Sequence, residues 1–290
     1  MSVAVVTDSA STISPEVVDS GLVRVVPLQV IIDDEALDEG SEGATPEKVA
    51  AALREKRAVS TSRPAPAVFG ELYAQLADEG VTEIVSVHLS AEVSGTFESA
   101  LVASRTAPVP VTCVDSRQVG VATGYAVESA CAVIAAGGTA ADAAKAARAR
   151  AEAATSLFYV NTLEYLRRGG RVGAAAAVFG GVLAVKPLLG IVDGVIAPQA
   201  KVRTAAKAIA QLEAMAVAAA GEQRVEACVA HLAAEERATA MAERLAEQLG
   251  DRLAPAGDGS PVRCVELGGV LGAHVGPGML AICVAPVLDA

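Results

Sequence analysis

The stretch Glu83–Thr96, EIVSVHLSAEVSGT, contains a strand, a polar loop and the start of a helix. Its apolar run up to His88 predicts a short buried strand. Gly95 permits a close backbone approach, and we expect the next helix to begin at Thr96. A helix amino terminus offers N–H groups and the positive end of a dipole, so this loop favours an anionic ligand; the alternative is an ordinary helix cap.

Similar strand and helix patterns flank this stretch. Val3–Thr7 predicts a buried strand that ends at Asp8, and Val109–Val114 predicts another that ends at Asp115. We expect helices over Ala67–Glu79, Thr96–Ser104, Val119–Ala136 and Ala140–Ala154. Strands that alternate with helices indicate a parallel sheet with right-handed crossovers. Ligands of such sheets bind at the carboxyl ends of the strands, where the polar loops Asp8-Ser9, Ser90–Ser94 and Asp115-Ser116 are expected to gather. Asp8, Glu92 and Asp115 are expected as loop-organising groups.

The second half of the chain has a different pattern. Pro187–Ala197, with Asp193-Gly194 between two apolar runs, predicts a β-hairpin. A hairpin in an otherwise alternating pattern indicates a mixed sheet. The sequence therefore predicts an α/β protein, with an N-terminal parallel-sheet domain over residues 1–155 and a C-terminal α/β domain with a mixed sheet over residues 156–290.

Four further stretches carry local predictions. Val23–Ile32 is expected to form one extended segment, and Thr45 with Pro46 is expected to start a helix. Ser60–Pro66 holds two prolines and is expected to be a loop. Gly268–Gly278 is expected to be a glycine-rich loop.

Composition limits the classes of ligand. The chain has 23 Lys and Arg against 34 Asp and Glu, a net charge of −11, which argues against a nucleic-acid partner. Aromatic residues make up 3% and Trp is absent, so cavities are expected to be aliphatic and to suit a hydrocarbon. The longest apolar run, 174–185, is shorter than the about 20 residues of a transmembrane helix. The amino terminus lacks a signal-peptide pattern and the five cysteines show no CxxC pair, so we expect a cytoplasmic protein.

Two loops carry candidate binding residues. Thr61 and Ser62 place adjacent hydroxyls before Pro64, where they can hydrogen-bond a ligand oxygen or merely cap the next helix. The run GGVLGAHVGPG over Gly268–Gly278 can lie close to a ligand, and His274 within it is either functional or structural.

An arginine cluster lies in an otherwise acidic chain. Arg167, Arg168 and Arg171 fall within five residues and next to glycines. Such a cluster suits an acidic protein surface, a phosphate or an anionic membrane, although cations also occur at ordinary helix ends. No GxxxxGK[ST] nucleotide loop is present, and spacing alone establishes no metal or acid–base cluster.

Seven motifs, in order, resemble the DegV family, the fatty-acid-binding proteins that serve as subunits of bacterial fatty acid kinase. The resemblance covers nearly the whole chain. The motifs are Thr7-Asp8-Ser9, Thr61-Ser62-Arg63-Pro64, Ser94-Gly95-Thr96, Val114-Asp115-Ser116, Leu163–Gly173, Lys186–Leu189 and Gly272–Gly278. The chain departs from the usual family pattern at Arg63, Ala65, Phe97, Ala273 and Val275.

The resemblance implies one long-chain fatty acid held between the two domains, no other cofactor and no metal. It implies a non-catalytic subunit whose ATP-dependent kinase partner phosphorylates the bound carboxylate. Carried onto this sequence, the carboxylate-binding residues are Thr61, Ser62, Ser94, Gly95 and His274. The arginines at 167, 168 and 171 are then expected to dock the kinase or to contact a membrane surface transiently.

Two other functions fit the same sequence. One is a self-contained enzyme that acts on small phosphorylated or hydroxylated substrates, because the fold resembles the dihydroxyacetone-binding domain of triose kinases. His274 and its glycine-rich run would then hold a triose or a phosphate. The other is a regulatory module that senses fatty acid and docks through the arginine cluster.

Overall fold

The computed structural model describes residues 2–40, 42–173, 175, 186–255 and 259–287. The chain divides into two compact units. Unit 1 contains the residues up to 29 and residues 62–153, and unit 2 contains residues 30–61 and 154–289. The domain boundary drawn from the sequence after residue 155 would place residues 30–61 in the N-terminal domain, whereas their contacts lie in unit 2.

Unit 1 is built on a four-stranded sheet in the order β2-β1-β6-β7. The strands are β1 (Val3–Asp8), β2 (Val23–Val26), β6 (Glu83–His88) and β7 (Val111–Asp115). All three neighbouring pairs are parallel, which confirms the predicted parallel sheet. The carboxyl ends of these strands therefore lie at one edge.

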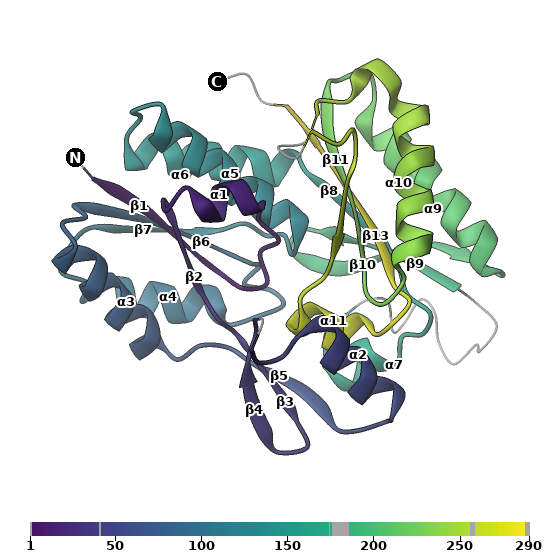
Figure 1. Ribbon diagram of the computed structural model, residues 1–290, viewed down its shortest axis with the longest axis horizontal. Helices are drawn as coiled ribbons and strands as arrows, with labels where there is room; N and C mark the ends of the chain where they lie inside the picture. The colour runs from purple at the N-terminus through teal and green to yellow at the C-terminus, as the bar shows by residue number, and fades with distance from the viewer. Residues whose placement is uncertain (1, 41, 174, 176–185, 256–258, 288–290) are drawn as a thin grey trace. The chain divides into compact units, whose positions relative to one another are not determined.

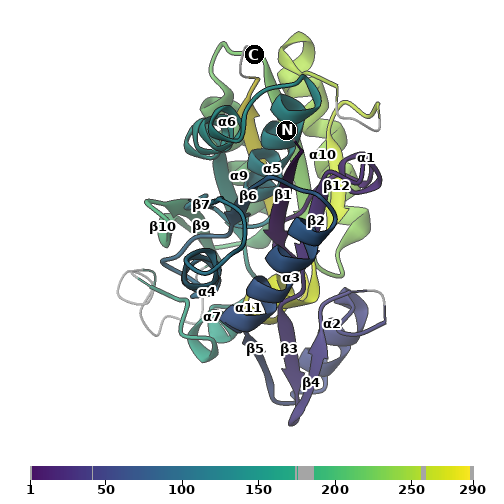
Figure 2. The same ribbon diagram turned by 90° about the vertical axis from the view of Figure 1, so that its left-hand side faces the viewer.

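Helices cover both faces of this sheet. Figures 1 and 2 show α3 (Pro66–Asp78) and α4 (Thr96–Ser104) on one side, and α5 (Val121–Ala135) and α6 (Ala140–Ala153) on the other. A short helix, α1 (Pro15–Asp19), connects β1 to β2. Val5 packs into the core with α5 and α6, whereas the next residue, Val6, packs with α3 and α4. Because consecutive strand residues point to opposite faces and both faces are covered, the first four residues of β1, Val3 to Val6, are all apolar.

Unit 2 contains a six-stranded sheet in the order β10-β9-β8-β13-β11-β12. The strands are β8 (Thr155–Tyr159), β9 (Lys186–Val192), β10 (Val195–Val202), β11 (Val225–His231), β12 (Arg263–Glu266) and β13 (Leu280–Pro286). Only β11 and β12 pair in parallel, so the sheet is mixed, as predicted. The predicted hairpin is confirmed: Asp193 and Gly194 both have positive φ between β9 and β10.

The core of this sheet lies under two helices, α9 (Ala205–Ala220) and α10 (Glu235–Leu249) (Figure 1). Leu212 and Met241 from these helices are completely buried with Tyr159 and Ile282 of the sheet. A 3-10 turn, η1 (Gly250–Arg252), follows α10. No described helix has the length and apolar character of a membrane span, and the apolar run 174–185 lies outside the described residues except for residue 175.

A smaller part of unit 2 carries short elements. A three-stranded sheet has the order β4-β3-β5, with β3 (Gln29–Ile32), β4 (Glu35–Asp38) and β5 (Val59–Ser62). The helices are α2 (Pro46–Arg54), α7 (Glu164–Arg168) and α11 (Gly269–Val275). The predicted start of α2 is confirmed, because the Thr45 hydroxyl accepts from Lys48 N at 3.2 Å.

Two predictions in this region were wrong. Val23–Ile32 is not one extended segment but two strands of different sheets, because Pro27 interrupts it and cannot donate to a sheet ladder. Ser60–Pro66 is not wholly a loop: the β-branched pair Val59 and Thr61 continues β5 to Ser62, before the prolines. The hairpin strand β4 was not predicted.

The expected glycine-rich loop was also wrong, because Gly269–Val275 forms α11. Its glycines serve close packing. A Cβ added at Gly269 would lie 2.6 Å from the Ala44 carbonyl oxygen, and one at Gly272 would lie 3.1 Å from the Leu232 side chain. Packing between elements therefore outweighs the low helix propensity of glycine.

We expect Gly269→Ala to destabilise the protein by about 1–3 kcal/mol, because its methyl group would overlap a backbone oxygen that cannot move aside easily. Gly70→Ala is the matched control. Gly70 lies within α3 with open space around it, so the same change should stabilise the helix by about 0.5–1 kcal/mol. Urea unfolding of the two variants measures both effects, and equal shifts would contradict the packing role of Gly269.

Candidate functional site

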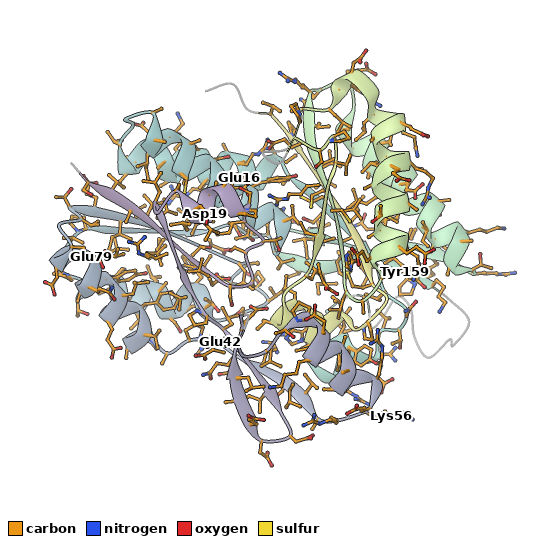
Figure 3. The ribbon with its side chains drawn as sticks, in the orientation of Figure 1. Glu16, Asp19, Glu42, Lys56, Glu79 and Tyr159 are labelled. Atoms are coloured by element: carbon orange, nitrogen blue, oxygen red, sulfur yellow. The ribbon has the colours of Figure 1, made fainter. Side chains whose placement is uncertain are left out.

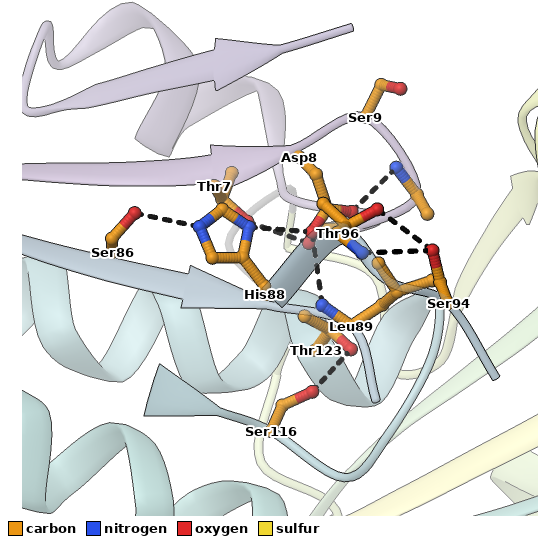
Figure 4. Close-up of polar contacts among 12 residues, drawn as sticks. Thr7, Asp8, Ser9, Ser86, His88, Leu89, Ser94, Thr96, Ser116 and Thr123 are labelled. Atoms are coloured by element: carbon orange, nitrogen blue, oxygen red, sulfur yellow. Dashed lines mark hydrogen bonds and ion pairs between the residues drawn. The ribbon is translucent and has the colours of Figure 1, made fainter. Parts of the chain in front are cut away.

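The carboxyl edge of the unit 1 sheet is organised by Asp8 (Figure 4). This carboxylate is completely buried and accepts three hydrogen bonds, from Ala10 N (3.2 Å), Leu89 N (3.1 Å) and His88 Nδ1 (2.9 Å). A buried carboxylate requires such donors to offset its lost hydration. Asp8 thereby joins the end of β1 to the loop after β6, which confirms its expected role in loop organisation.

The hydrogen bonds continue inward from Asp8 through three more buried side chains. His88 Nε2 lies 2.7 Å from Ser86 Oγ, and Ser86 Oγ lies 2.8 Å from the Tyr73 hydroxyl. With a neutral imidazole the order is fixed: Tyr73 donates to Ser86, Ser86 donates to His88, and His88 donates to Asp8. Burial raises the pKa of Tyr73, which keeps its proton available as the first donor.

This order of Ser, His and Asp resembles that of a hydrolase triad, but its surroundings exclude nucleophilic attack. Ser86, His88 and Asp8 are all 0% exposed, so a substrate cannot reach the serine oxygen. The network therefore stabilises the loop that follows β6. His88 is a satisfied polar group, with both nitrogens bonded.

The loop after β7 joins the same edge. Asp115 Oδ1 accepts from Arg117 N at 2.8 Å and from Ala91 N at 3.2 Å. Ser116 Oγ lies 3.1 Å from Thr123 Oγ1 at the start of α5 (Figure 4). The predicted gathering of polar loops at one sheet edge is thus confirmed within unit 1.

Ser94 and Gly95 lie at the start of α4, as predicted. Ser94 Oγ lies 2.9 Å from Thr96 Oγ1 and accepts from Thr96 N at 3.4 Å. Arg63 Nη1 donates to the Gly95 carbonyl oxygen at 3.5 Å, and a Cβ at Gly95 would overlap this guanidinium. Ser62 Oγ donates to the Arg63 carbonyl oxygen at 3.3 Å. Arg63 therefore joins the predicted residues, and its only signal in the sequence was that it departs from the family loop.

Thr61 and His274 meet in unit 2. Thr61 Oγ1, on β5, lies 2.8 Å from His274 Nε2, on α11. The other ring nitrogen, Nδ1, is buried without a hydrogen-bond partner, and a Cβ at Gly169 would lie 2.2 Å from it. Burial, and secondarily the positive charge of Arg171, lower the pKa of His274 to about 4. The ring is therefore neutral near pH 7.

A cavity of about 550 Å³ adjoins this pair. Its walls come from β3 and the β3–β4 turn, the end of α2, β5, the region of α7, and α11. They comprise Ile31, Asp33, Asp34, Leu53, Lys56, Arg57, Ala58, Val59, Ser60, Thr61, Tyr165, Arg168, Gly169, Arg171, Ala273 and His274. The sequence analysis did not identify Lys56 and Arg57 as cavity residues. The two adjacent cations lie shortly before Thr61, and such a pair resembles an ordinary basic helix end.

The predicted docking arginines have different surroundings. Arg168 forms an ion pair with Glu164 one turn earlier, and Arg171 donates to the Gly169 carbonyl oxygen. Both line the cavity, whereas Arg167 is exposed and does not. Two of the three arginines thus belong to the walls that also carry His274.

The predicted carboxylate-binding residues fall into two groups. Thr61 and His274 belong to unit 2, whereas Ser62, Ser94 and Gly95 belong to unit 1. Hydrogen bonds join Thr61 to His274, and Arg63 to both Ser62 and Gly95, whereas Ser94 bonds to Thr96. A shared ligand for both groups stays a prediction. In the described part of the chain, no cluster of three or more His, Cys, Asp or Glu side chains could hold a metal ion.

Comparison with known proteins agrees with this architecture. Residues 2–287 match the family model described as "Uncharacterised protein, DegV family". The chain belongs to the DegV family.

A DegV domain-containing protein from Streptomyces coelicolor is 47% identical, over 98% of both chains. Two solved DegV structures are similar throughout. One, described as fatty acid binding, is from Thermus thermophilus: it has a TM-score of 0.88, 28% identity, and coverage of 99% of this chain and 100% of that one. The other, DegV from Bacillus subtilis, is described as a fatty acid binding protein and has a TM-score of 0.86, 29% identity and the same coverage.

The lowered pKa of His274 predicts a loss of stability in acid. The unfolded chain binds this proton near the ordinary value of 6.5, whereas the folded ring binds it only near pH 4. Between these values the unfolded state holds more protons, so the free energy of unfolding falls as the pH is lowered. We expect this contribution to be on the order of 3 kcal/mol.

His274→Gln removes this titration and is the matched comparison. Urea unfolding of both proteins from pH 7 to pH 4 measures the difference in slope. Parallel stability curves would contradict a neutral, buried His274.

Proposed function

We propose that this DegV protein binds one long-chain fatty acid between its two domains and presents the carboxylate to a separate, ATP-dependent kinase subunit, which forms an acyl phosphate. The observation that carries the proposal is the Thr61–His274 pair at the cavity of unit 2. The fatty acid binding described for the Thermus thermophilus and Bacillus subtilis proteins supports it.

The protonation of the pair suits a carboxylate. Because the ring is neutral, one of its nitrogens carries a proton. When this proton is on Nε2, His274 donates to Thr61 Oγ1, and the threonine hydrogen is free to be donated to a ligand oxygen. Arg171, which lines the same cavity, adds a positive charge near the ligand. In unit 1, the Ser94 hydroxyl and the backbone at Gly95 supply the second group of proposed contacts.

The aliphatic composition of the chain suits the hydrocarbon tail. A tail of about fourteen methylenes gains on the order of 11 kcal/mol gross when it leaves water, at about 0.8 kcal/mol per CH₂. Ordering and association offset much of this gain. The carboxylate contacts therefore determine orientation and specificity more than total affinity.

The kinase step requires a second protein in this proposal. The sequence has no GxxxxGK[ST] loop to bind ATP phosphates, so ATP would be bound by the kinase subunit. This chain would act as the non-catalytic, cytoplasmic carrier of the lipid and would serve phospholipid metabolism.

Protein purified from a bacterial host should carry about one C14–C18 fatty acid per chain, and mass spectrometry of the denatured protein measures it.

Thr61→Val should weaken binding by about 10- to 150-fold, because it removes a hydrogen bond to a charged group worth about 1.5–3 kcal/mol. Ser94→Ala should act similarly. Thr61→Ser keeps the hydroxyl and is the control. The proposal would be refuted if the purified wild-type protein carried no fatty acid and also took up none when the acid was added.

The arginine cluster is proposed to dock the kinase. Exposed acidic residues such as Glu16, Asp19, Glu42 and Glu79 (Figure 3) would repel an acidic partner, so we expect the cations to set partner choice and encounter rate. The triple variant Arg167→Ala, Arg168→Ala and Arg171→Ala should still bind fatty acid, with an affinity lowered only by the loss of the Arg171 charge, but should support acyl-phosphate formation poorly. The deficit should shrink toward 1 M salt, where the Debye length is about 3 Å.

A triple variant of equal charge provides the control: Arg54→Ala, Arg105→Ala and Arg224→Ala, all at exposed positions. This control variant should support acyl-phosphate formation by the kinase at the wild-type rate. Equal rates for both triple variants at low salt would exclude docking through the arginine cluster and leave its residues a role at a helix end.

A further inference from the structure

Two cysteines lie opposite each other in the six-stranded sheet of unit 2. Cys228 is on β11 and Cys283 is on β13, and the register of this antiparallel pair of strands aligns the two residues directly. Residues aligned in this way project from the same face of a sheet, with Cβ atoms about 4.5–5.5 Å apart. Both side chains are thiols. The fold creates this alignment, because α10, β12 and α11 lie between the two strands in the sequence.

The cysteine pair occupies the face of the sheet that does not pack against α9 and α10. The adjacent strand residues Val229 and Ile282 belong to the core under those helices. Because consecutive residues of a strand point to opposite faces, Cys228 and Cys283 point away from that core. Both are buried nonetheless, with 0% and 4% of their surface exposed. Bulky oxidants are therefore kept from the pair, whereas an oxidant close to water in size can reach it through local opening of the fold.

The pair belongs to a row of side chains that crosses four strands. Cys283 is aligned with Ser156 on β8, and Cys228 is aligned with Arg263 on β12. Arg263 is itself buried, with 7% of its surface exposed. A cation beside a thiol favours the charged thiolate, which is the form that attacks an oxidant. The row therefore favours Cys228 as the thiol that is oxidised first, with Cys283 in position to react next.

A third cysteine of the same sheet provides a contrast. Cys264 follows Arg263 on β12, so its side chain points to the opposite face, and it is exposed. The residue aligned with it on β11 is Val229. Cys264 is therefore more accessible to solvent than the pair, but the sheet does not place a second cysteine across from it.

We propose that Cys228 and Cys283 are a redox modification site, at which a hydroperoxide produces a reversible cross-strand disulfide. The Cys228 thiolate attacks the O–O bond, so that a sulfenic acid forms and the other oxygen leaves with the thiol proton as an alcohol, or as water from hydrogen peroxide. The Cys283 sulfur then attacks the sulfenic sulfur. The S–S bond forms, and the hydroxyl group leaves with the second thiol proton as water. The two thiols lose two electrons, which the hydroperoxide gains.

The geometry suits a disulfide better than a bound metal ion. Structural zinc sites use four ligands, and the part of the chain that the structure describes contains no group of three or more His, Cys, Asp or Glu side chains that could hold a metal. Disulfides place their Cβ atoms about 3.5–4.5 Å apart, so the two strands must approach slightly when the bond forms. Such a bond is easier to reduce than an unstrained one, as a reversible modification requires.

The bond would join β11 to β13 around a segment that contains α10, β12 and α11. Closing a long loop restricts the unfolded chain more than the folded one. The oxidised protein should therefore unfold at a higher urea concentration than the reduced protein.

The experiment treats the reduced, folded wild-type protein with hydrogen peroxide, blocks the remaining thiols with an alkylating reagent, and maps the peptides by mass spectrometry. We expect a peptide in which Cys228 and Cys283 are linked, with the loss of two hydrogens, and we expect dithiothreitol to restore both thiols. Urea unfolding of the oxidised and reduced samples measures the shift in the midpoint.

Alanine variants test the assignment of the two residues. Cys228→Ala and Cys283→Ala should each lose both the linked peptide and the urea shift, and the same face already carries the aligned pair Ala230 and Ala281. In Cys283→Ala the sulfenic acid persists, so dimedone should label Cys228 more strongly than in wild type. Cys131→Ala is the matched control, because Cys131 is a buried thiol on α5 of unit 1. It should retain the linked peptide and the shift.

Three results would overturn the proposal. One is oxidation confined to the exposed Cys264, with or without linkage of two chains. Another is oxidation of Cys228 to sulfinic acid in wild type without a linked peptide. The third is a linked peptide that forms only when peroxide is added in urea, because the disulfide would then owe nothing to the register of the folded sheet. None of these results depends on whether the protein binds fatty acid.

Discussion

The hydrogen bond between Thr61 and His274 joins side chains that are 213 positions apart in the sequence. Burial lowers the pKa of His274 to about 4, so the ring that forms this bond is neutral near pH 7. Glycines provide that burial, because Gly169 leaves room for the imidazole and Gly276, at φ 75°, leaves room for the Tyr165 ring. Gly269 likewise admits the backbone at Ala44. The contacts of α11 with α2 and α7 therefore depend on the absence of three side chains.

Local sequence patterns correctly predicted those elements whose packing favours the same conformation as their own residues. The bounds of β6 and α4 were correct to the residue, and the turn at Asp193 and Gly194 was recognisable because only a few residue types suit its backbone. The prediction of a loop over Gly268–Gly278 was wrong. Glycine is locally a sign of a flexible loop, whereas here it permits close packing around α11. No local pattern reports which surfaces a helix will meet.

The same limit applies to the site. Family resemblance selected Thr61 and His274, and the structure brings them within hydrogen-bonding distance. Lys56 and Arg57 were not selected, because cations after a helix are common and their shared cavity with Arg171 arises only in three dimensions. Conversely, the order of Ser86, His88 and Asp8 resembles a catalytic motif, and complete burial assigns it a structural role.

The path of the chain between the two units has a consequence for synthesis on the ribosome. All of unit 1 is encoded before residue 154, so its sheet can form while residues 30–61 remain an extruded loop. That loop contains Lys56 and Thr61, and the residues of α7 and α11 that line the cavity with them are translated more than a hundred residues later. One half of the cavity must therefore wait for the other, and during this interval β3 and β5 lack their neighbours from α7 and α11 and are open to aggregation.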